Sequence, residues 1–240
     1  MIVKKRLTMK NIWSAINDQF FNLDNKLLKT FTHLFTKPEL VIKGFIDGTR
    51  KKYLNVIQYF AISLTLVGIQ VFLLNTFFQE ALNIELPFLE GLENAESQKN
   101  NPFKDFGFDQ YNNYQSVFYI LSVPISAIST WMAYRIAGIK RYNFTEHLVI
   151  NLYYSAQIII ITAVVSILLL CFGINYYLIT ALITIFTFIY LFYILKRVFK
   201  TTFLETLAYF FMVMIAFGIV FVGILILGVI VGVVIALVTR

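Results

Sequence analysis

The stretch LAYFFMVMIAFGIVFVGILILGVIVGVVIALV, residues 207–238, runs for thirty-two residues without a charged side chain. As a helix, about 20 apolar residues already span the hydrocarbon core of a bilayer. This stretch therefore predicts a membrane-spanning helix. A straight helix of this length would measure about 48 Å against a hydrocarbon core of about 30 Å. We therefore expect it to tilt, kink or project from the bilayer.

Four further apolar stretches precede it, and together the five predict an all-α integral membrane protein. The chain is 59% apolar and 14% charged, whereas soluble domains average about 25% charged residues. A soluble all-helical protein with buried helices is the alternative, but apolar runs of this length need lipid to cover them. The five predicted spans are residues 56–78, 115–137, 148–172, 176–195 and 207–238.

Basic residues alternate from one connection to the next. Residues 1–53 carry eleven Lys and Arg, and the turns 135–147 and 196–205 carry three each, so only three of the twenty lie elsewhere. Lys and Arg near span ends stay on the cytoplasmic side of a membrane. We therefore expect a cytoplasmic N-terminus, with the acidic loop 79–114 and the C-terminus outside. This segregation accounts for the net charge of +7 without nucleic-acid binding.

The chain divides into a basic amphipathic cytoplasmic region, residues 1–53, and a five-span membrane domain, residues 54–240. Apolar residues recur at helical spacing within residues 11–47, which predicts short amphipathic helices. These helices either lie in the membrane interface, with lysines facing anionic lipid, or pack against the ends of the spans. Both interpretations remain open at this point.

Two local signals frame the last of these helices. Thr36-Lys-Pro-Glu39 has the pattern of a capping box with proline in the first turn, and Gly48 can end the helix. The cluster Arg50-Lys51-Lys52, just before the first span, is mainly an orientation signal, and a lipid headgroup role is a weaker addition.

The two basic turns share a second pattern. Asn143 with Glu146, and Thr202 with Glu205, are predicted capping boxes at the start of the third and fifth spans. A glutamate there satisfies unpaired backbone donors and faces the positive end of the helix dipole. Spans two and three therefore repeat the layout of spans four and five, through either duplication or independent capping.

Three patches carry a family resemblance: Thr30-Phe-Thr-His-Leu34 with Pro38 and Gly48 to Tyr53; Glu146-His147-Leu148-Val149 with Tyr153; and Tyr190 to Phe199. Their order resembles a bacterial membrane family, frequent in Bacteroidetes, classed as domain of unknown function 3667. The resemblance implies a multi-pass protein of the bacterial cytoplasmic (inner) membrane, without a known reaction or substrate. Many members carry an N-terminal zinc ribbon built on Cys-x-x-Cys pairs, which this chain lacks, since its single cysteine is Cys171.

No catalytic, cofactor-binding or metal-binding constellation is predicted. The two histidines, His33 and His147, cannot build a usual zinc site. We expect His147 at the cytoplasmic boundary, beside the capping Glu146. Within the spans, Gln70 and Gln157 can hydrogen-bond across helices or line a solute path. Aromatic residues near the span ends fit interfacial belts; they are Tyr53, Tyr59, Trp131, Tyr134, Tyr153, Tyr154, Tyr176 and Tyr177.

Gly228 and Gly232 form a Gly-x-x-x-Gly pair, which permits the close approach of a second helix. A homo-oligomer or a membrane partner would fit it, although glycine is also simply common in membrane helices. The overall prediction is a non-enzymatic membrane-organising or partner-binding protein that uses no cofactor. Its expected partner is the bilayer, with anionic lipid at the cytoplasmic face. A small-solute or ion transporter or channel is the alternative.

Overall fold

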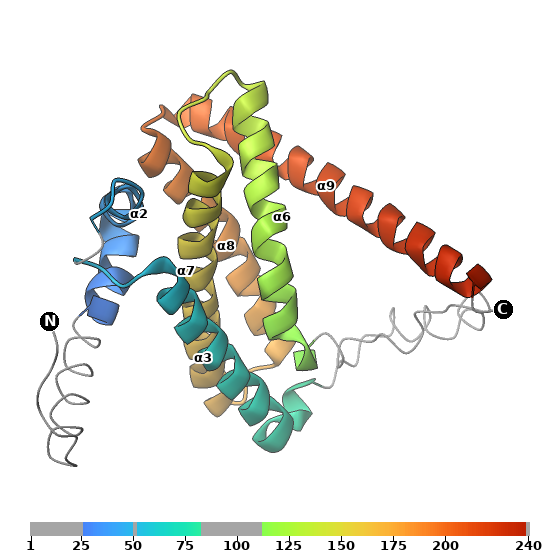
Figure 1. Ribbon diagram of the computed structural model, residues 1–240. Helices are drawn as coiled ribbons and strands as arrows, with labels where there is room; N and C mark the ends of the chain where they lie inside the picture. The colour runs from blue at the N-terminus through green and yellow to red at the C-terminus, as the bar shows by residue number, and fades with distance from the viewer. Residues whose placement is uncertain (1–25, 50–51, 83–111, 239–240) are drawn as a thin grey trace, which may run out of the picture.

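The computed structural model describes residues 26–49, 52–82 and 112–238, with side chains to residue 230 (Figure 1). Most of these residues are helical, the rest form turns and connections, and none of them belongs to a strand. Five helices are long and apolar enough to cross a membrane, which confirms the predicted fold class. They are α3 (Val56–Phe77), α6 (Gln115–Ile136), α7 (Phe144–Cys171), α8 (Tyr176–Phe199) and α9 (Phe203–Val238).

Two shorter helices precede the bundle and one follows α3. A helical segment, residues 26–36, leads into α2 (Pro38–Ile46), and the 3-10 helix η1 (Gln79–Leu82) follows α3. We call residues 26–46 the N-terminal cap. The basic end of the bundle is the end where α6 and α8 finish and α7 and α9 begin. Its basic residues are Arg135, Lys140, Arg141, Lys196, Arg197 and Lys200.

At the basic end, three helices extend beyond the predicted spans. Helix α7 begins at Phe144, α8 continues to Phe199, and α9 begins at Phe203. The predicted spans end where the apolar residues end, but helical backbone hydrogen bonds continue into the neighbouring polar residues. In α7 the capping box is complete: Asn143 Oδ1 accepts from Glu146 N at 2.9 Å, and Glu146 Oε2 accepts from Asn143 N at 2.6 Å.

The second predicted capping box also forms. Glu205 Oε2 accepts from Thr202 N at 2.8 Å, and Thr202 Oγ1 accepts from Glu205 N at 3.4 Å. The repeated layout of the two helix pairs remains a prediction, because capping alone accounts for these bonds.

The capping box predicted for α2 is wrong. Proline does occupy the first turn, but the residue before the helix is Lys37 and no side chain caps it. Thr36 Oγ1 instead donates to Thr32 O at 3.0 Å, and Glu39 turns to Arg197 of α8. The end of the helix is as predicted, since Gly48 has a φ of 89°, which glycine adopts without steric cost.

Helix α7 is the centre of the bundle. It packs against α3, α6 and α8, and half of its most apolar window is buried, more than in any other long helix among the described residues. Several tyrosine rings lie between α7 and its neighbouring helices. The predicted interfacial belt is wrong for Tyr59, Tyr134 and Tyr153, which have no exposed surface, because their rings fill the space between helices.

The N-terminal cap belongs to the same core as the bundle. Leu34, Val41 and Ile42 are completely buried and join the main cluster of apolar residues. For residues 26–46, packing against the ends of the spans is therefore the interpretation that the structure supports. The amphipathic stretch predicted before residue 26 lies outside the described residues.

Helix α9 packs against α6 near the basic end and then diverges from the bundle (Figure 1). Its last buried side chain in the described part is Ala216. The tilt, kink or projection expected of this long helix relative to the bilayer stays a prediction, because what the structure shows is its divergence from the other helices. A methyl group added at Gly228 would meet no atom within 4 Å, so Gly228 has no close helix partner within the described chain. The side-chain surroundings of Gly232 lie outside the described part.

We expect Asn143→Ala to lower the free energy of unfolding by about 1 kcal/mol, because it removes the acceptor for the Glu146 backbone N–H. Reversible denaturation in mixed micelles would measure the change. Thr145→Ala is the matched control, since Thr145 is an exposed residue of the same first turn. Equal effects of the two substitutions would show that the capping box contributes nothing to stability.

Candidate functional site

At the junction between the N-terminal cap and the bundle, one backbone carbonyl of the cap lacks its helical N–H donor. In a continuous helix the carbonyl of Leu34 would accept from the backbone N–H of residue 38, but residue 38 is proline and has none. Tyr190 of α8 supplies the donor instead, with its hydroxyl 3.1 Å from Leu34 O. Because both groups are buried, the bond replaces a helix bond that the sequence forbids.

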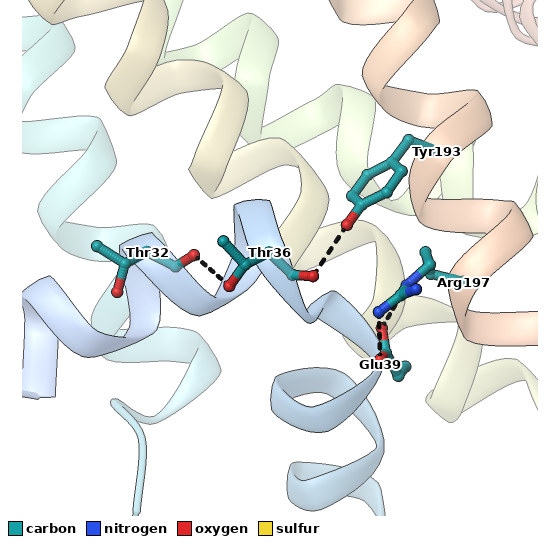
Figure 2. Close-up of polar contacts among 5 residues, drawn as sticks. All are labelled: Thr32, Thr36, Glu39, Tyr193 and Arg197. Atoms are coloured by element: carbon teal, nitrogen blue, oxygen red, sulfur yellow. Dashed lines mark hydrogen bonds and ion pairs between the residues drawn. The ribbon is translucent and has the colours of Figure 1, made fainter.

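Two further side chains of the bundle donate to cap carbonyls. Tyr193 donates to Thr36 O at 3.2 Å (Figure 2), and Gln157 Nε2 donates to Phe31 O at 3.3 Å. The Gln157 side chain is held from the other side, since its Oε1 accepts from the Tyr59 hydroxyl. Three helices, α3, α7 and α8, thereby fix the position of the cap.

An ion pair closes this junction at the surface. Arg197 Nη2 donates to Glu39 Oε1 at 2.7 Å and Arg197 Nε donates to Glu39 Oε2 at 3.0 Å, as Figure 2 shows. Two parallel bonds of this kind fix an orientation as well as a contact. The Arg197 side chain is 42% exposed, so solvent screening limits the contribution of the pair to stability.

The connection from the cap to α3 is bonded on both sides. Thr30 Oγ1 accepts from Leu54 N at 2.9 Å, and Tyr153 of α7 donates to Leu54 O at 2.8 Å. His33 Nδ1 lies 2.8 Å from the Tyr53 hydroxyl. The hydroxyls of Thr30 and Tyr153 thus satisfy the backbone of Leu54 where the chain enters the bundle, and the His33–Tyr53 contact lies beside them.

A second polar cluster lies between α6 and α7. Thr130 Oγ1 accepts from Asn151 Nδ2 at 2.8 Å and lies 3.2 Å from His147 Nδ1. Asn151 Oδ1 accepts from Ser126 at 2.6 Å. His147 is 1% exposed and is surrounded by the rings of Tyr134, Tyr142 and Phe199. His147 is therefore a packed, hydrogen-bonded residue of the bundle, in the first turn of α7 beside the capping Glu146, and its place at the cytoplasmic boundary stays a prediction.

A third polar cluster lies at the opposite end, around Tyr176. The Tyr176 hydroxyl accepts from Gln115 Nε2 at 2.6 Å and from Gln70 Nε2 at 3.4 Å. Both glutamines are buried, and the Oε1 atom of each has no hydrogen-bond partner within the described chain. An open depression of about 530 Å³ lies near this end, lined by residues of α3, η1 and the α7–α8 turn.

The structure separates the residues that the sequence singled out. Glu146 and Glu205 accept bonds from backbone N–H groups at the starts of α7 and α9. Gln157 donates to the N-terminal cap, and Gln70 lies beside Tyr176 at the end of the bundle opposite the basic end. Lys52 lies over the Tyr53 ring at 5.4 Å, while Arg50 and Lys51 fall outside the described residues. No three His, Cys, Asp or Glu side chains gather into a metal-binding arrangement within the ranges described above.

Sequence reasoning missed the residues that carry most of these bonds. Tyr190, Thr130 and Asn151 were not considered as site residues, because each looks ordinary in an apolar run. One signal was available: Asn151 follows His147 by four residues, which places both on one helix face.

The family model described as Protein of unknown function (DUF3667) matches residues 24–68. The matched residues include the N-terminal cap and the first half of α3, so the predicted resemblance is confirmed over this minor part of the chain. No curated protein and no solved structure matches the chain. The similarity therefore points to a family of unknown function and brings no reaction or ligand with it.

Tyr190→Phe and Tyr193→Phe make a matched pair, because each removes one hydroxyl that donates to a cap carbonyl. We expect Tyr190→Phe to cost about 2 kcal/mol, since it leaves the buried Leu34 carbonyl without a donor. Tyr193 is less buried, so water can replace its hydroxyl, and we expect a cost of about 0.5 kcal/mol or less.

Denaturation would measure both values, and amide hydrogen exchange would localise them. Faster exchange in residues 26–46 should appear in Tyr190→Phe alone. If both variants lost the same stability, burial of the Tyr190 bond would not be what fixes the cap.

Proposed function

We propose that this chain is a non-enzymatic protein of the bacterial cytoplasmic membrane whose N-terminal cap is a fixed platform for a partner. In this proposal the basic end of the bundle faces the cytoplasm. The observation that carries it is the junction itself: bonds from α7 and α8 to cap carbonyls, together with the Glu39–Arg197 ion pair. A cap tied down in this way presents a constant surface.

The outward side of the cap supports the partner role. Leu28 is 65% exposed and Leu40 is 46% exposed, although the other apolar residues of both helices are buried or partly buried. The family match adds support, since residues 24–68 begin at the cap and end within α3. The part shared with that family is thus mainly the platform and its attachment to the bundle.

A transporter remains the second candidate, and one observation favours it. Gln70 and Gln115 place amide oxygens without partners inside the bundle around Tyr176, where a polar solute or water could bind. Gln157 no longer supports this function, because both ends of its amide hold protein groups. A test of transport should therefore change Gln70 and leave Gln157 intact.

Cysteine labelling tests the orientation. In a Cys171→Ser background, we expect Asp47→Cys to react with a membrane-impermeant maleimide only after the cells are permeabilised, because Asp47 is exposed at the basic end. Gln79→Cys, exposed at the opposite end, should react in intact cells. Reaction of both cysteines in intact cells, or of neither, would contradict the proposed topology.

A photo-crosslinking amino acid in place of Leu28 tests the platform. We expect it to capture a protein in living cells, whereas the same probe in place of Leu182, 57% exposed on α8, should capture lipid. Lipid adducts at both positions would oppose a partner-binding cap. Solute flux into proteoliposomes that Gln70→Leu abolishes would favour the transporter instead.

A further inference from the structure

Two cationic side chains from other parts of the chain lie within electrostatic range of Lys43 at the basic end. Lys43 belongs to α2, Arg141 to the turn between α6 and α7, and Lys200 to the end of α8. Helix α2 packs against both α7 and α8, which brings Lys43 within electrostatic range of the other two cations. Like charges gathered by packing repel one another unless an anion lies among them.

The ammonium group of Lys43 is the least satisfied of the three. Its Nζ atom is covered from solvent and donates no hydrogen bond to any residue in the described ranges. Carbonyls at the end of α8 would be natural acceptors, but two of them are already engaged. Lys196 O accepts from Lys200 N at 3.0 Å, and Phe199 O accepts from Arg141 Nη1 at 3.4 Å.

Two nearby carboxylates offset this repulsion only in part, because they raise the pKa of Lys43 by less than burial and the two cations lower it. Glu39 and Asp47 both lie within electrostatic range of Lys43, but Glu39 is paired with Arg197. Neither carboxylate forms an ion pair with Lys43 in the part of the chain that the structure describes. Burial, and then the charges of Arg141 and Lys200, lower the pKa of Lys43. An anion bound between Lys43, Arg141 and Lys200 would raise the pKa of Lys43 again, because it favours the charged ammonium.

We propose that Lys43, Arg141 and Lys200 form a binding site for a phosphate group, carried by an anionic phospholipid or by a soluble phosphate. Arg141 is suited to this role, because a guanidinium offers several donors in one plane and only one of them contacts Phe199 O. Its guanidinium lies 5.3 Å from the Tyr142 ring centre, which limits its orientations. The site adjoins the ends of two spans, at the level where lipid phosphates lie.

The site deepens the proposed function, since it lies between the platform and the bundle, and a ligand there would bridge the two. This proposal rests on the proposed function in one respect: the proposed orientation decides from which side of the membrane the phosphate comes. The positions of the three cations do not depend on that side.

The decisive variant is Lys43→Met, studied in the purified full chain. Lys43 is half-buried and its covered ammonium group has no partner within the described residues, and removing such a charge is neutral or stabilising for a fold. This variant should therefore melt at the same temperature as the original chain or higher in zwitterionic detergent. Lys140→Met is the matched control, because Lys140 is exposed and directly precedes Arg141.

One arm of the experiment titrates inorganic phosphate in zwitterionic detergent against sodium chloride of equal ionic strength. The other compares nanodiscs of phosphatidylglycerol and phosphatidylcholine. We expect the melting temperature of the original chain to rise with phosphate or with phosphatidylglycerol. The apparent affinity should fall roughly tenfold in Lys43→Met and stay unchanged in Lys140→Met. Arg141→Gln should weaken binding in the same arm.

The two arms separate the sources of the phosphate group. A response to phosphate alone identifies a soluble ligand, and a response to phosphatidylglycerol alone identifies a lipid headgroup. No response of the original chain in either arm overturns the proposal, as does an equal response of Lys43→Met. Failure of the cysteine mapping with an intact phosphate response would reject the proposed orientation and leave the site standing.

Discussion

A buried carbonyl needs a donor, and the attachment of the N-terminal cap depends on this requirement. Where protein excludes water, an unpaired carbonyl costs free energy, because nothing replaces the missing bond. Pro38 creates such a carbonyl at Leu34, and Tyr190 of a distant helix satisfies it. Tyr153 does the same for Leu54. Breaks in the helical backbone are thus the points at which the fold is joined together.

This use of tyrosine changes the meaning of the aromatic composition. Fourteen tyrosines in 240 residues suggest a belt at the membrane surface, yet several of the largest completely buried side chains are tyrosines. Tyrosine combines a large apolar ring with one hydroxyl. It can therefore fill the space between helices and still donate to a carbonyl, which phenylalanine cannot do.

The elements that the sequence predicted well depend on local information. Hydropathy located all five long helices, and the capping boxes at Asn143 and Thr202 involve residues three positions apart. The error at α2 has the opposite origin. Glu39 fits a local capping pattern, but Arg197, 158 positions further along the chain, takes its carboxylate. No local rule could foresee that competition.

The candidate sites follow the same division. His147 and Gln157 stood out as polar residues in apolar surroundings, but their roles depend on Thr130, Tyr59 and Phe31, which the sequence could not place beside them. Lys43 was invisible for a related reason. A lysine on an amphipathic helix is normally solvated, and only the docking of α2 covers its ammonium group.

The divergence of α9 divides this helix into a packed first part and an unpacked second part. Its first turns are held by α6 and α8, while the side chains described after Ala216 are all exposed or partly exposed. Internal packing therefore sets the slope of the first part, and bilayer thickness sets the slope of the second. An apolar helix longer than the bilayer is thick tilts further as the membrane thins, and the portion of α9 beyond Ala216 is free to do so without disturbing the tyrosine-bonded core.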